Sequence, residues 1–186
     1  MITLQTDFSG LSEAHDEQGI LRSRNTVTKL ITDEIANGIP SSRIILGGFS
    51  QGGAISLFTG VTIPHKFAGI FGLSSYLLMG NKIKELAEEA KGINRDTPIF
   101  MGHGDADPLV RYEWGVKTAE ALKTELGHTK VDFRTYKYVS ICRRVAVSTD
   151  FDRGLEHSAD PKEIDDLERF LTECLQKVED TPAAGL

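Results

Sequence analysis

Apolar residues recur along the chain in two alternating patterns, one typical of helices and one typical of buried strands. Between residues 17 and 36, six aliphatic residues recur at steps of three and four, which predicts a helix with one apolar face. They are Ile20, Leu21, Val27, Leu30, Ile31 and Ile35. Asn37, Gly38 and Pro40 supply the stop signal for this helix. A short apolar run at 43–47 then predicts a buried strand.

The same alternation continues to the end of the chain. Further helices are predicted at 51–60, 82–91, 112–126 and 161–178, and further strands at 67–73, 98–101 and 130–136. Pro161 suits the first turn of the last helix. The inward face of that helix is predicted to carry Ile164, Leu167, Phe170, Leu171 and Leu175.

Strands that alternate with helices predict an α/β fold with a mostly parallel sheet, helices on both of its faces and right-handed crossovers. We expect one domain over residues 1–178 and a flexible tail over 179–186. In such sheets, chemistry gathers in the loops at the carboxyl ends of the strands.

Composition and charge remove several classes of function. A hydrophobic content of 40% with 26% charged residues is that of a globular chain. The net charge of −6 and the scattered basic residues argue against nucleic-acid binding. Two cysteines predict neither a disulfide framework nor a zinc site, and no metal or cofactor is expected. The first residues do not resemble a signal peptide and no apolar stretch is long enough to cross a bilayer, so we expect a reducing, soluble compartment.

One motif with a chemical meaning lies between the first strand and the second helix. Residues 48–52 fit G-x-S-x-G, the pattern of a nucleophile elbow, in which Ser50 occupies a sharp strand-to-helix turn. Small neighbours allow that turn, and the helix N-terminus places the Gln51 backbone N–H near a developing oxyanion. The alternative is a glycine-rich turn in which Ser50 only caps the helix.

Two later loops complete a possible triad. Asp105 and Asp107 follow the third strand, and either carboxylate can orient a histidine. His157 precedes the last helix and is the candidate general base. The order serine, aspartate, histidine is that of α/β-hydrolases. Taken alone, the aspartates are also ordinary turn residues.

Other residues are weaker candidates for the site. Ser74 and Ser75 follow the second strand without the glycines of an elbow, so we interpret them as a loop. Four further histidines have less suitable positions: His15, His65, His103 and His128. His103 is interpreted as structural. Tyr112, Trp114 and the run 77–79 line either an apolar pocket or the packed core, and the pattern does not separate the two.

Three segments in order resemble the acyl-protein thioesterases, also called cytosolic lysophospholipases, and the fungal members in particular. They are the elbow region 39–54, the acid loop 102–110 and the histidine loop 154–160. The resemblance extends from about Leu11 to Lys177 and implies the α/β-hydrolase fold. It also implies that the acid is Asp107, directly before the proline, with Ser50 as nucleophile and His157 as base.

The resemblance implies hydrolysis of long-chain acyl thioesters, such as palmitoyl-cysteine on GTPases, together with lysophospholipid and small-ester hydrolysis. No cofactor, nucleic acid or stable membrane insertion is implied, and members are cytoplasmic, some also nuclear. A carboxylesterase acting on small or phospholipid esters is the alternative enzyme. A catalytically impaired fragment that serves as a binding module is the alternative from another class.

The chain departs from this family in two places. The family's first strands and a His-Gly-Leu-Gly-Asp-type loop have no counterpart before Leu11, so we expect a truncated domain without the second oxyanion donor. Loss of one such donor lowers rates by on the order of 10²- to 10³-fold. We also expect an uncovered sheet edge and apolar surface. Residues 138–153 form an insert that we interpret as a translated intron, and we expect it to displace His157.

Overall fold

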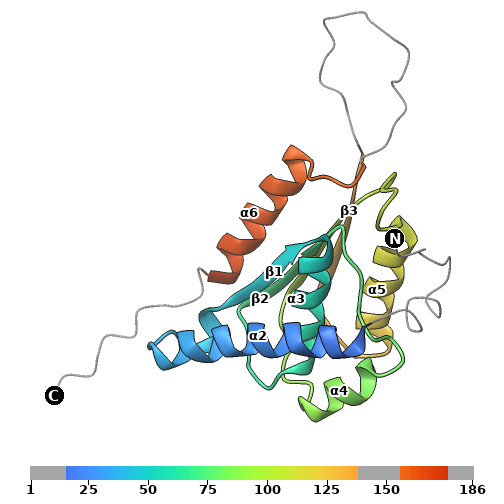
Figure 1. Ribbon diagram of the computed structural model, residues 1–186. Helices are drawn as coiled ribbons and strands as arrows, with labels where there is room; N and C mark the ends of the chain where they lie inside the picture. The colour runs from blue at the N-terminus through green and yellow to red at the C-terminus, as the bar shows by residue number, and fades with distance from the viewer. Residues whose placement is uncertain (1–15, 138–155, 176–186) are drawn as a thin grey trace, which may run out of the picture.

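The computed structural model describes residues 16–137 and 156–175, which form a four-stranded parallel sheet with helices (Figure 1). The predicted insert at 138–153, the segment before Leu11 and the tail at 179–186 lie outside the described residues. In chain order the elements are α2 (Glu17–Ala36), the 3₁₀ turn η1 (Ser41–Arg43), β1 (Ile45–Phe49), α3 (Ser50–Thr62), β2 (Gly69–Leu73), α4 (Ile83–Glu89), β3 (Ile99–Gly104), α5 (Tyr112–Thr124), β4 (Val131–Tyr136) and α6 (Pro161–Leu175).

The four strands follow one another across the sheet in the order in which they occur along the chain. Each neighbouring pair is parallel, from β1 with β2 to β3 with β4. Crossovers of one handedness that advance in one direction must all pass on the same face of the sheet. Helices α3, α4 and α5 accordingly share one core with α2, and α6 stands apart from them in Figure 1.

Alternation along the strands separates the two faces of the sheet. Ile70, Ile99 and Met101 point into the large core beneath α2, α3, α4 and α5. Phe71, Leu73 and Phe100 point to the opposite face, where they pack with residues of α6. The predicted parallel sheet with helices on both faces is therefore confirmed.

Most predicted elements are present, and their ends differ by a few residues. The first strand was predicted at 43–47, but residues 41–43 form η1 and the strand runs two residues further, to Phe49. Asp16 caps the start of α2 by accepting a hydrogen bond from the Gly19 backbone N–H at 2.9 Å. Gly38, with a φ of 96°, follows the end of this helix as the stop signal predicted.

One sheet edge and the adjacent helix surface are open in the described part of the chain. β1 lies at the edge of the sheet, and Leu30, on the apolar face of α2, is 61% exposed. A hollow of about 680 Å³ is lined by residues of α2, β1 and α3. Its lining includes Val27, Leu30, Ile31, Ile44, Leu46 and Ile55. The expected uncovered edge and apolar surface are both present among the described residues.

The prediction for the inward face of α6 was wrong in part. Ile164 is 47% exposed and Leu175 is 38% exposed, whereas the acidic residues Glu163 and Asp166 are buried against the sheet. Asp166 accepts hydrogen bonds from the Tyr136 hydroxyl at 2.9 Å and forms an ion pair with Arg134 at 2.9 Å. The apolar pattern failed at Asp166 because these polar partners on β4 compensate for the burial of its carboxylate.

Glu163 occupies a second polar position on this face. Its side chain lies over Gly102 of β3, where a Cβ atom would overlap the Glu163 carboxylate. One carboxylate oxygen is 3.4 Å from the Asp160 backbone N–H, and the other is buried without a hydrogen-bond partner within the described residues. Burial is the main cause that raises the pKa of Glu163 from 4.5 to about 7.

We predict that Glu163→Gln flattens the pH dependence of stability. Because the pKa of Glu163 is raised on folding, its contribution to stability is fully present below pH 4.5 and is lost as pH rises through about 7. The variant should be the more stable protein at pH 8, by on the order of 3 kcal/mol, and the advantage should vanish below pH 4.5. Urea unfolding of both proteins across this pH range measures the difference, and an advantage that is constant with pH would contradict the prediction.

Candidate active site

The turn from β1 into α3 holds Ser50 in a backbone conformation that few residues adopt. Ser50 has a φ of 54°, in the left-handed region, and is the first residue of α3. A Cβ atom at Gly48 would lie 2.7 Å from the backbone carbon of Gly52, and one at Gly53 would lie 2.7 Å from the Gly48 carbonyl oxygen. Glycine at these two positions therefore allows the strand and helix to meet.

The glycine that ends the G-x-S-x-G pattern, Gly52, is not required by a close contact, contrary to expectation. A Cβ atom at Gly52 would meet nothing within 4 Å among the described residues. Gly53, which lies outside the pattern, is the second crowded position. Gly53 differs from Gly52 only in lying where α3 approaches β1 closely. The sequence pattern alone therefore did not identify Gly53.

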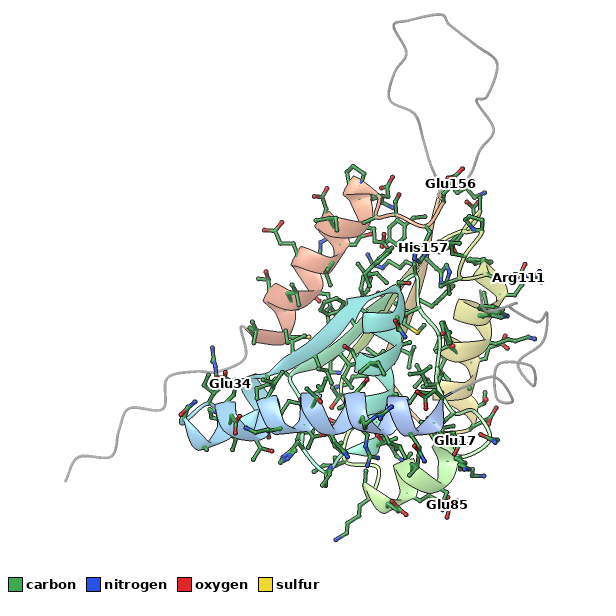
Figure 2. All side chains as sticks on the ribbon, viewed as in Figure 1. Glu17, Glu34, Glu85, Arg111, Glu156 and His157 are labelled. Atoms are coloured by element: carbon green, nitrogen blue, oxygen red, sulfur yellow. The ribbon has the colours of Figure 1, made fainter. Side chains whose placement is uncertain are left out.

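Three side chains from distant segments form one chain of hydrogen bonds at the carboxyl ends of the strands. The Nε2 atom of His157 lies 2.9 Å from Ser50 Oγ, and its Nδ1 atom lies 2.8 Å from Asp107 Oδ2. Figure 2 shows His157 just before the N-terminal end of α6. The side chain of Asp107 is fully buried and that of His157 is 15% exposed.

The two carboxylate oxygens of Asp107 have different hydrogen-bond partners. Oδ1 accepts hydrogen bonds from the backbone N–H groups of Leu109 and Val110, each at 2.9 Å. Oδ2 is left to accept from Nδ1 of His157. Two backbone donors and one imidazole donor thus fix the orientation of this buried carboxylate.

The other aspartate of the loop does not contact His157. The backbone N–H of Asp105 donates to the Tyr136 carbonyl oxygen at 3.1 Å, and its buried Oδ1 atom has no hydrogen-bond partner among the described residues. Of the two aspartates that the sequence left open, the structure therefore brings Asp107 to the histidine.

His157 is held in one orientation and one tautomer. Because a carboxylate only accepts, the proton lies on Nδ1, and Nε2 accepts a hydrogen bond from the Ser50 hydroxyl. The Phe49 ring packs against the imidazole with 4.7 Å between the ring centres. The expected displacement of His157 by the insert is not observed, because the imidazole reaches both of its partners.

The N-terminus of α3 faces the same site. Gln51 is the second residue of this helix, where backbone N–H groups have no acceptor within the helix. The partial positive charge of the helix end adds to their attraction for an anion. Ser50 and Gln51 thus place a nucleophile and a donor side by side, an arrangement suited to attack on a carbonyl carbon.

The remaining candidates lie away from this chain of hydrogen bonds. Ser74 and Ser75 are buried in the loop after β2, and no hydrogen bond joins either to His157 among the described residues. His65 offers its carbonyl oxygen to Asn94, and His128 is buried beyond α5. His15 lies outside the described residues. Trp114 and the run 77–79 are buried in the core, and Tyr112 bonds Thr135 at 2.7 Å.

Within residues 16–137 and 156–175, no group of three or more His, Cys, Asp or Glu side chains is placed to hold a metal ion. None of the helices in that part of the chain is both long enough and apolar enough to span a membrane.

Comparison with known proteins adds a family and several relatives. A sequence model of the family described as Phospholipase/Carboxylesterase matches residues 6–175. The chain is 46% identical to acyl-protein thioesterase 1 of Emericella nidulans, over 89% of this chain and 62% of the relative. It is 47% identical to acyl-protein thioesterase 1 of Neurospora crassa, over 91% of this chain and 62% of the relative. The chain thus spans less than two thirds of the length of these relatives.

A solved structure gives a similar result for the fold. The crystal structure of Arabidopsis thaliana SOBER1 superimposes with a TM-score of 0.68 at 29% sequence identity. The match covers 86% of this chain and 66% of that protein. The part of the fold that the two chains share therefore includes most of the residues described here.

We predict that Gly48→Ala and Gly52→Ala have opposite outcomes, although both replace a glycine of the same motif. The first places a methyl group against helix backbone, so we expect a loss of about 1–3 kcal/mol and a displaced Ser50. The second enters open space, so we expect stability within about 0.5 kcal/mol of the unaltered protein. Denaturant unfolding measures both, and equal losses would contradict the geometry of the turn.

Proposed function

The chain belongs to the phospholipase/carboxylesterase family, and from that premise we propose that it is a serine hydrolase that cleaves long-chain acyl thioesters from protein cysteines. The observation that carries the proposal is the unbroken hydrogen-bond chain from Ser50 through His157 to Asp107. Such a chain makes a serine hydroxyl nucleophilic at neutral pH, because the imidazole takes the proton as the oxygen attacks.

The first half of the reaction forms an acyl-enzyme. Ser50 Oγ attacks the thioester carbonyl carbon while its proton passes to Nε2 of His157, and the carboxylate of Asp107 stabilises the imidazolium. The backbone N–H of Gln51 donates to the tetrahedral oxyanion. The carbon–sulfur bond then breaks, and His157 returns the proton to the leaving cysteine sulfur.

The second half releases the fatty acid. Water attacks the acyl carbon and gives a proton to Nε2 of His157, a second tetrahedral oxyanion forms, and the bond to Ser50 Oγ breaks. His157 returns the proton to Ser50, which restores the starting state. Every step uses side chains, a backbone N–H group and water.

We propose S-acylated proteins, such as palmitoylated GTPases, as the substrates. Two relatives at 46% and 47% identity are named acyl-protein thioesterase 1, which supports a thioester on a protein. Phe49, which packs against His157, is 38% exposed, and Leu109 in the acid loop is 56% exposed. Exposed apolar side chains next to the nucleophile and the acid support a substrate with a hydrocarbon chain.

A second candidate is hydrolysis of small or phospholipid oxygen esters, which the description of the matched family favours. The two candidates share Ser50, His157 and Asp107, so the residues of the triad do not separate them. Rates on a palmitoyl thioester and on the oxygen ester of the same acyl chain do. A higher kcat/KM for the thioester would support the first candidate.

We predict that Ser50→Ala abolishes both labelling by a fluorophosphonate probe and hydrolysis of a fatty thioester, because the attacking oxygen is removed. Ser42→Ala is the control, since Ser42 is an exposed serine on the 3₁₀ turn before β1 and lies outside the site. Rates are measured on the purified 186-residue chain. Turnover that survives in the Ser50 variant would refute the assignment, and unlabelled Ser50 in a folded, unaltered chain would refute the activity.

We also predict that the two aspartates of the acid loop differ in their effect on rate. Asp107→Asn leaves the geometry but removes the charge that stabilises the imidazolium, so we expect the labelling rate to fall by on the order of 10³- to 10⁴-fold. Asp105→Asn is the matched control and should label within about threefold of the unaltered chain, because Asp105 does not contact His157. The reverse order of effects would assign the acid to Asp105.

A further inference from the structure

A fully buried histidine closes the loop that carries the triad carboxylate. His103 lies on β3, one residue before the strand ends, and has no exposed surface. Its Nε2 atom is 2.9 Å from the carbonyl oxygen of Val110, seven residues further along the chain. The bond therefore spans the loop from the end of β3 to the start of α5.

The surroundings of His103 define its tautomer. A carbonyl oxygen only accepts, so Nε2 carries the proton. Nδ1 has no hydrogen-bond partner among the described residues and faces α5, where a Cβ atom at Gly115 would overlap it. The rings of Tyr112 and Phe133 complete the enclosure, with centres 6.0 Å and 6.5 Å away.

The surroundings of this imidazole favour its neutral form. Burial lowers the pKa of His103, and the opposing effects of the Val110 hydrogen bond and of the charges of Asp107 and Glu113 do not reverse that direction. His157 acts in the same direction as burial. Neutrality has a consequence for the site, because Nε2 of His103 lies only 3.7 Å from Oδ2 of Asp107. A charged imidazole there would compete with His157 for the carboxylate.

Val110 connects His103 to the triad. Its carbonyl oxygen accepts from His103, and its backbone N–H donates to Oδ1 of Asp107 at 2.9 Å. Its side chain is buried against Trp114 of α5. The fixed position of Val110 therefore fixes the rotation of the Asp107 carboxylate, which aims Oδ2 at His157.

We infer that His103 is a positioning residue for the triad: by holding Val110 through Nε2–H, it sets the orientation of Asp107 and, through it, of His157 and Ser50. The inference rests on the proposed function, in which this triad performs hydrolysis. It adds a fourth side chain that touches no substrate and acts only through the acid loop.

The first test uses the unaltered, ¹⁵N-labelled chain. Imidazole nitrogen shifts at pH 7 should show His103 as neutral, with the proton on Nε2. A downfield proton resonance should mark Nδ1–H of His157 in its hydrogen bond to Asp107. A charged His103, or one protonated on Nδ1, would overturn the inference without any substitution.

The second test compares two amides that differ in reach. In His103→Gln the side-chain nitrogen reaches the position of Nε2 and can still donate to Val110, whereas in His103→Asn it reaches only as far as Nδ1. We expect the asparagine variant to lose about 10- to 100-fold in the rate of fluorophosphonate labelling, together with the His157 resonance. The glutamine variant should recover most of the rate and the resonance.

His128→Asn is the matched control, because His128 is also buried and its pKa is lowered, to about 4, mainly by burial. It lies beside Arg95 and Leu126, away from the triad. This variant should keep the labelling rate and the His157 resonance, even if the substitution lowers the stability of the fold. An asparagine variant of His103 that keeps both, or a glutamine variant that recovers neither, would overturn the inference.

The two readouts separate failure of this inference from failure of the proposed function. If the unaltered chain does not label at all, hydrolysis by Ser50 is refuted. The resonance of His157 is independent of turnover, so its loss in His103→Asn and its return in His103→Gln still decide whether His103 orients the acid loop.

Discussion

The close approach of α3 to the end of β1 is the contact on which the site depends. The carbonyl oxygen of Gly48 lies where a Cβ atom at Gly53 would be only 2.7 Å away, so the strand and the helix meet without side chains between them. This proximity forces Ser50 into the left-handed region at a φ of 54°. Packing of α3 against β1 and β2 holds the strained residue in place, and its hydroxyl projects beyond the sheet toward His157.

The parallel order of the strands brings the other two residues of the triad to Ser50. Because β1, β2, β3 and β4 are adjacent and parallel, their carboxyl ends lie along one edge of the sheet. Asp107 and His157 are 50 positions apart, and Ser50 and His157 are 107 apart, yet both pairs lie within hydrogen-bonding distance. Helix α6 covers the face of the sheet opposite α3, and it begins directly after the loop that carries His157. Anchoring of α6 through Asp166 to Arg134 and Tyr136 thus also limits where His157 can lie.

The buried ionisable groups around the site have different hydrogen-bond partners. Asp107 accepts three hydrogen bonds, two from backbone N–H groups and one from His157. His103 is tightly enclosed, and its burial lowers its pKa although the hydrogen bond to Val110 acts in the opposite direction. Glu163, on the other face of β3, has one long hydrogen bond, and its burial raises its pKa. The pKa of one buried group near this strand end is therefore lowered and that of another is raised, because their local surroundings differ.

The sequence by itself determined where most helices and strands lie and which side chains are reactive. Apolar runs and helical periodicity predicted the α-helices and strands of the described residues to within a few positions, whereas the 3₁₀ turn η1 was not predicted. Motif order predicted Ser50, Asp107 and His157 as one group, with the choice of Asp107 over Asp105 resting on the family resemblance.

Tertiary structure decided what depends on partners from distant segments. Glu163 and Asp166 are buried while Ile164 is exposed, because Tyr136, Arg134 and the bare backbone at Gly102 offer polar contacts and space that no local pattern records. The spacing of Asp160 and Glu163 was a capping-box signal that could have predicted part of this. The role of His103 depended on a bond across a loop to Val110, and that of Gly53 on the approach of helix to strand. Contacts of this kind join residues that are distant in sequence and carry no local pattern, so only the tertiary structure decided them.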